Sequence, residues 1–123
     1  MKNGFRILTL LFFALQLSAI EITPAEPPTY PEAARINRVQ GDVTLQVEFG
    51  KLGSVIRIIR QSAYPVLGKR AKNEIWKWRF SGTSEGQKVV VVFQYRLKES
   101  AQGTTVKFSK DNRKVTIIAP PIN

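Results

Sequence analysis

The side chains that most often carry out chemistry in enzymes are scarce in this 123-residue sequence. It contains no histidine and no cysteine. These absences remove thiol nucleophiles, the commonest proton shuttle near neutral pH and most zinc-binding geometries. The carboxylates stand singly, at positions such as Asp42, Glu48, Glu74 and Glu85, and none forms a recognisable acid–base pair. The sequence therefore favours a non-enzymatic protein with no cofactor and no metal.

Basic residues dominate the charge. The chain has 19 Lys and Arg residues against nine Asp and Glu, a formal net charge of +10. Such a surface attracts phosphate, anionic lipid head groups or acidic protein segments. No base-reading motif is present, which argues against nucleic acid. We expect an acidic protein partner, and peripheral association with an anionic envelope polymer is the alternative.

The amino-terminal residues have the form of a secretory leader. Lys2 and Arg6 precede an apolar run over residues 7–17, and Ser18 and Ala19 supply small residues for cleavage. The run is about half the roughly 20 residues that span a bilayer. We predict a signal peptide over residues 1–19 and export, with a short membrane anchor as the alternative if the leader is not cleaved.

Three prolines follow within residues 20–29, which favours extended chain, and we interpret this segment as a Pro-rich tether. Tyr30 and Pro31 then begin a short helix with Ala34 facing inward, and Gly41 is expected to end it. Residues 43–49 alternate apolar and polar side chains, as in a strand with one buried face.

A glycine-bounded link over residues 50–53 should return the chain as a hairpin over residues 55–61. The second strand alternates less regularly, which indicates either coverage on both faces or a bulge. A helix then begins at Pro65. One face of that helix carries a buried stripe of Leu67, Ala71, Ile75 and Trp78. Trp76 lies off this stripe, so it either contacts a partner or packs partly against the carboxy-terminal hairpin.

Residues 88–97 form the strongest predicted strand. Its first half is apolar on both faces, which is typical of a central strand or of an edge that invites another strand. Residues 104–108 and 114–118 read as a second hairpin around a polar turn. The predicted fold is α+β, with a three-stranded antiparallel sheet packed by helices over residues 30–98 and an extra hairpin and tail over residues 99–123.

An ordered series of short motifs runs through residues 30–98. It consists of Tyr30-Pro31 with Ala34, Gly41-Asp42-Val43, Val47, Gly53-Ser54-Val55, Ser62, Leu67, Ala71, Trp78-Arg79-Phe80 and Val91-Val92-Phe93-Gln94-Tyr95. In order and spacing, this series resembles the carboxy-terminal domain of TonB-type energy transducers. The resemblance implies the same order of helix, hairpin, helix and strand that the periodicity predicts.

The resemblance also implies a function. Domains of this family lie in the periplasm and capture an extended segment of an outer-membrane receptor by adding it to the last strand of the sheet, in the service of transmembrane transport. Here that strand would be residues 88–97. The predicted peptide-binding residues are Lys88, Val90, Val92, Gln94 and Arg96, with Trp76 and Tyr30 as further contacts. The alternative is a stand-alone envelope domain that forms a homodimer or larger assembly through the same edge, without a role in transport.

Several departures from the family pattern bear on this expectation. A full transducer would need a histidine-bearing membrane anchor and a long proline-rich spacer, and neither is present. The usual acidic turn is replaced by residues 50–53, and Ser81-Gly82 stands where the family has a proline. The extra hairpin after Ala101 could itself pair with residues 88–97 and occupy the binding edge.

Overall fold

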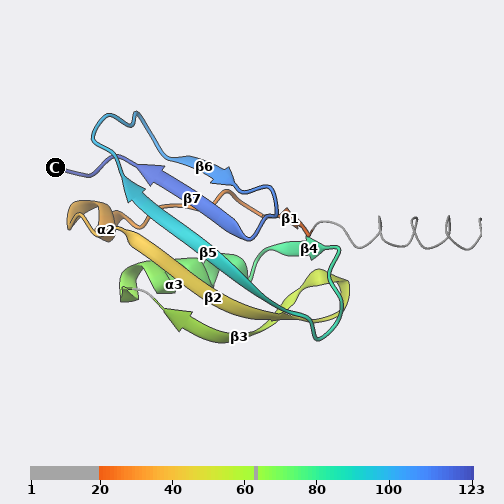
Figure 1. The fold of residues 1–123 in the computed structure, drawn as a ribbon. Coiled ribbons are helices and arrows are strands. Elements are labelled where there is room, and N and C mark those ends of the chain that lie inside the picture. Colours follow the sequence, from red (N-terminus) through yellow and green to blue (C-terminus); the bar gives the residue numbers. More distant parts are fainter. Residues whose placement is uncertain (1–19, 63) are drawn as a thin grey trace, which may run out of the picture.

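A computed structural model describes residues 20–62 and 64–123 of the chain (Figure 1). The predicted leader, residues 1–19, lies outside the described residues. Within the described ranges, no helix combines the length and the apolar character needed to cross a membrane.

The centre of the molecule is one five-stranded sheet. Its members are β2 (Gly41–Phe49), β3 (Val55–Ser62), β5 (Lys88–Leu97), β6 (Thr105–Phe108) and β7 (Lys114–Ala119). The strand order is β3-β2-β5-β7-β6, and all pairs are antiparallel except β5 with β7, which run parallel (Figure 1). The expected α+β class is confirmed. The sheet has five strands instead of three because the carboxy-terminal hairpin joins it.

Helices cover one face of this sheet. In α3 (Pro65–Ile75), the predicted stripe residues Leu67, Ala71 and Ile75 are fully buried, and the helix packs across β2 and β3. A short 3-10 turn, η1 (Lys51–Gly53), links β2 to β3. The opposite face of the sheet carries exposed and half-buried side chains, as is common for antiparallel sheets.

The first helix is shorter than expected. α2 (Glu32–Ile36) ends at Asn37, whose side-chain amide donates to the Ala33 carbonyl at 2.9 Å. Arg38 follows with a positive φ of 55°, which turns the chain out of the helix. The prediction that Gly41 ends the helix is therefore wrong, and Gly41 instead begins β2.

The irregular alternation of β3 comes from two bulges. The pairing of β2 with β3 shifts between Gln46 and Val47 and again between Glu48 and Phe49. Ile59 and Ile56 are the extra residues, and both are exposed. A bulge was one of the two explanations that the sequence left open.

The amino-terminal segment is not a free tether. β1 (Glu21–Thr23) pairs antiparallel with β4 (Arg79–Ser81) in a separate two-stranded sheet, and Ile22 lies opposite Phe80. Ile20 is buried. Residues 20–30 therefore run along the body of the domain (Figure 1).

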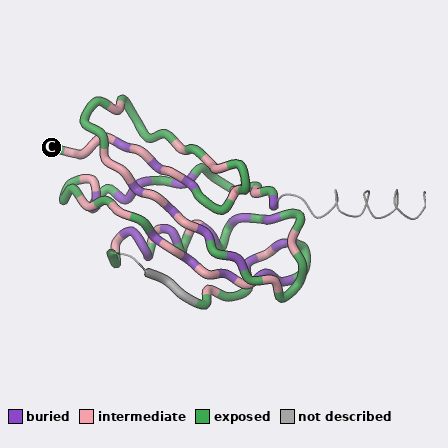
Figure 2. The backbone as a smooth tube through the Cα atoms, in the orientation of Figure 1, coloured by how far each residue is buried: buried purple, intermediate pink, exposed green. Residues whose placement is uncertain are grey.

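The core lies between the sheet and α3, and along β2 and β5 buried residues alternate with half-buried or exposed ones (Figure 2). Trp78 is a core residue, as predicted, although it lies beyond the end of α3 and not on the helix itself. The Trp78 ring stacks on Phe93 with centroids 5.2 Å apart and meets Phe108 of β6 edge-on at 5.9 Å. The carboxy-terminal hairpin therefore shares the core of the domain.

Candidate functional site

The five residues predicted to bind peptide lie together on the open face of β5. The alternate residues of this strand, including Val91, Phe93 and Tyr95, are buried beneath the sheet. The side chains on the open face are exposed at its start and half-buried further along. They belong to Lys88, Val90, Val92, Gln94 and Arg96.

The backbone of β5 is not an open edge. β2 pairs with it along one side, from Gly41 opposite Tyr95 to Glu48 opposite Lys88. β7 pairs with the other side, from Lys114 opposite Val92 to Ala119 opposite Leu97. The prediction of a free edge is wrong for residues 92–97, because β7 pairs with them and buries its apolar side chains in the core. Residues 88–91 lie beyond the end of β7.

Two of the predicted contacts are engaged within the sheet. The Gln94 side-chain carbonyl accepts a hydrogen bond from the Thr116 hydroxyl of β7 at 3.0 Å. The Arg96 guanidinium lies 2.7 Å from the Asp42 carboxylate of β2. Lys88 and Val90 remain exposed, and 46% of the Val90 surface is accessible.

The two further candidates differ in accessibility. Trp76 lies just after α3 and is 39% exposed, so it is available to a partner. Tyr30 is buried: its hydroxyl donates to the Val39 carbonyl at 2.6 Å, and its ring meets Tyr95 edge-on. Burial raises the pKa of Tyr30 to about 12, against a smaller opposing effect of Arg96. The prediction of Tyr30 as a contact residue is therefore not supported, because it is a core residue.

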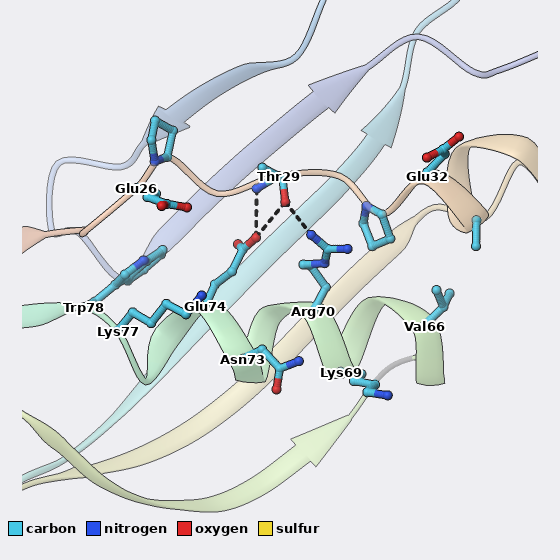
Figure 3. Close-up of a pocket in the computed structure, with 13 residues that line it drawn as sticks. Glu26, Thr29, Glu32, Val66, Lys69, Arg70, Asn73, Glu74, Lys77 and Trp78 are labelled. Carbon is cyan, nitrogen blue, oxygen red and sulfur yellow. Dashed lines mark hydrogen bonds between the residues drawn. The ribbon is translucent and has the colours of Figure 1, made fainter.

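Sequence reasoning missed a pocket of about 570 Å³ between the amino-terminal segment and α3 (Figure 3). Thr29 bridges its two walls. The Thr29 amide and hydroxyl both donate to Glu74 Oε1, at 3.0 and 2.9 Å, and Arg70 donates to the same hydroxyl at 2.8 Å. Lys69 and Lys77 line the wall formed by α3. Thr29 lies more than 40 positions from Arg70 and Glu74 in the sequence, so no local sequence pattern predicts these hydrogen bonds.

Burial raises the pKa of the Glu74 carboxyl, while the hydrogen bonds from Thr29 and the charges of Arg70 and Lys77 act in the opposite direction. Its second oxygen, Oε2, is buried without a hydrogen-bond partner, as is the hydroxyl of Tyr95. The Glu74 carboxyl thus fastens the amino-terminal segment to α3. In the described part of the chain, no cluster of acidic side chains is placed to hold a metal ion.

Residues 26–98, more than half of the chain, match the family model described as the Gram-negative bacterial TonB protein C-terminal. The chain belongs to this family. No curated protein matches it. TonB C-terminal domains are non-enzymatic, serve energy transduction for transport in the Gram-negative envelope, and generally interact with outer-membrane receptors. The match ends at residue 98, so β6 and β7 lie beyond it, and β1 precedes it.

Proposed function

We propose that this TonB-like domain acts in the periplasm and binds an extended segment of an outer-membrane receptor by strand addition, as part of energy-dependent transport. The observation that carries the proposal is the open sheet. Its strand order is linear, so β3 and β6 each have a strand on one side only. Unpaired backbone groups along such an edge give affinity for extended segments of many sequences.

Addition to residues 92–97 of β5 would require β7 to leave. Val115, Ile117 and Ala119 of β7 are buried against the core. Burial of one large aliphatic side chain contributes roughly 1.5–3 kcal/mol. The free energy lost when the side chains of β7 leave the core would therefore oppose binding. A receptor segment therefore adds more readily to an outer strand, and residues such as Lys88, Val90 and Trp76 would act through their side chains.

The test is a titration of isotope-labelled protein with synthetic peptides from the periplasm-facing segments of outer-membrane receptors of the same organism, followed by backbone amide NMR. We expect saturable shifts that concentrate on one sheet strand and a binding constant that weakens with salt, because the protein is basic. A peptide of the same composition with prolines at alternate positions is the control, since it lacks the amides that pair. No saturable shift with any receptor peptide would refute the proposal.

Self-assembly is the second candidate, and the apolar side chains of β3 favour it. Ile56 and Ile59 are 53% and 43% exposed on this outer strand. Two copies could pair β3 with β3, whereas assembly through β5 would again require β7 to leave. Sedimentation without peptide distinguishes the candidates, because assembly predicts a mass that rises with protein concentration. Adhesion to anionic polymer predicts instead strong salt dependence without strand-specific shifts.

A further inference from the structure

We infer that the outer edge of β6 is the docking strand, and that it takes an acidic, extended segment of the partner protein. This inference rests on the proposed function, and it moves the binding site from β5 to a strand outside the family match.

Of the three strands that could accept an added segment, β6 has the most suitable backbone. β5 is paired on both sides over residues 92–97. β3 carries two bulges, which interrupt the regular spacing of amides and carbonyls and commonly protect edge strands from pairing. β6 pairs with β7 without any shift, from Thr105 opposite Ile118 to Phe108 opposite Val115. Its outer side is therefore a regular, though short, template.

The direction of the backbone groups follows from one hydrogen bond. The Ser109 amide donates to the Lys114 carbonyl at 2.9 Å, toward β7. Because successive residues of a strand point to alternate sides, Lys107 also faces β7, and Val106 and Phe108 direct their amides and carbonyls outward. An added strand would pair with these two residues.

The charge around β6 selects an acidic occupant. Lys107 lies on β6 itself, and the turn and the start of β7 add Lys110, Arg113 and Lys114, all exposed. Asp111 is the single acid of residues 104–114. Its carboxylate is already engaged by the Ser109 hydroxyl at 2.7 Å and the Arg113 amide at 3.1 Å. Basic side chains beside an open edge attract an acidic segment and repel a basic one.

The hairpin is held in place before any partner arrives. Phe108 packs on Trp78, the Asn112 side chain donates to the Ile20 carbonyl at 2.8 Å, and Arg35 donates to the Pro120 carbonyl at 2.8 Å. An edge that is already ordered loses little conformational entropy on binding.

The test uses a capped eight-residue peptide in which Glu alternates with Val, and a matched peptide in which Lys replaces each Glu. We expect the Glu peptide to shift the amides of residues 105–109, and the Lys peptide to leave them unchanged. Lys107→Glu should weaken the binding of the Glu peptide roughly fivefold. Lys51→Glu, the same charge change at an exposed position of η1, should weaken its binding less than twofold.

A second variant tests the backbone. Val106→Pro removes an outward amide without removing a bond to β7, and prolines are tolerated at such edge positions. It should abolish the shifts at β6 while the amide spectrum of β2 and β5 stays folded. If this variant fails to fold, the comparison of Lys107→Glu with Lys51→Glu is the deciding test.

The outcomes separate this inference from the proposed function. Receptor peptides that bind with shifts on β3 or β5, or equal losses in the two charge variants, overturn the β6 site and leave receptor binding intact. Failure of every receptor peptide refutes the proposed function itself. Shifts at β6 that grow with protein concentration in the absence of peptide would make a second copy the occupant and overturn the inference.

Discussion

The two ends of the described chain, residues 20–30 and the β6–β7 hairpin, are attached to the family domain in different ways. β7 enters the main sheet and buries three side chains in its core. The amino-terminal segment buries Ile20 and Tyr30 at its two ends, and between them it is held by a three-residue ladder in a separate small sheet and a polar bridge from Thr29 to α3. The difference follows from sequence pattern, because β7 has an apolar side chain at every second position, whereas residues 20–29 are rich in proline.

This comparison predicts unequal stability. Burial of apolar surface contributes about 25 cal/mol per Å², whereas exposed polar bridges contribute about 1 kcal/mol or less each. Segments with few buried contacts open most easily. Residues 21–29, between these two buried ends, should therefore detach in local openings that leave β7 in place.

The largest expected effect is in β7. Ile117 is fully buried, so Ile117→Ala should lower the free energy of unfolding by roughly 2–5 kcal/mol, measured by denaturant titration. The neighbouring Ile118 lies on the open face and is half-buried, which makes Ile118→Ala a matched control with an expected loss of about 1 kcal/mol. Equal losses in the two variants would mean that β7 does not belong to the core.

A smaller effect is expected where the amino-terminal segment meets the core. Tyr30→Phe removes the hydrogen bond to the Val39 carbonyl and should lower the free energy of unfolding by about 1–3 kcal/mol. Tyr64 is 60% exposed, so Tyr64→Phe is the control and should change stability by less than about 0.5 kcal/mol. If Tyr30→Phe leaves the free energy of unfolding unchanged, the segment is not fastened at this point.

The buried Tyr30 hydroxyl also predicts an alkaline loss of stability. The folded-state pKa of Tyr30 is raised to about 12, from 10 in the unfolded chain, so the folded state retains the proton longer. The contribution of this group is complete below pH 10 and is lost as the pH rises toward 12. The free energy of unfolding, measured at a series of pH values across this interval, should fall less steeply for Tyr30→Phe than for the wild type. An equal fall in the two proteins would contradict the assignment.

Local patterns were sufficient for much of the fold. The alternation in β2, the apolar stripe of α3 and the long apolar run of β5 each predicted their element, because the signal lies within ten residues or so. β1 could not be found in this way, since three residues are too few to show a period. Its partner, β4, is more than 50 positions away.

The site was harder to predict because it depends on pairing. The sequence indicated that residues 114–118 form a strand and that the hairpin could cover β5, but alternation alone does not say which edge a strand joins. The sequence makes Tyr30 a candidate contact residue, but in the folded chain its hydroxyl donates to the Val39 carbonyl. The bridge between Thr29 and Glu74 joins positions 45 apart and arises only in the folded chain.

The smallest expected effect concerns the bridge between Thr29 and Glu74. It is a change in the slope of the free energy of unfolding against pH. Because the pKa of Glu74 is raised in the folded state, its contribution to stability is complete below the unfolded pKa of about 4.5 and is lost as the pH rises through the folded pKa. Glu74→Gln keeps an oxygen to accept from Thr29 but does not titrate, so it should flatten the pH dependence of the free energy of unfolding above pH 4.5. Thr29→Val removes a hydrogen bond that favours the charged carboxylate and so raises the folded pKa further, which should extend the decline to higher pH without changing where it begins. If Glu74→Gln retains the wild-type slope, the pH dependence of the free energy of unfolding comes from another group and not from Glu74.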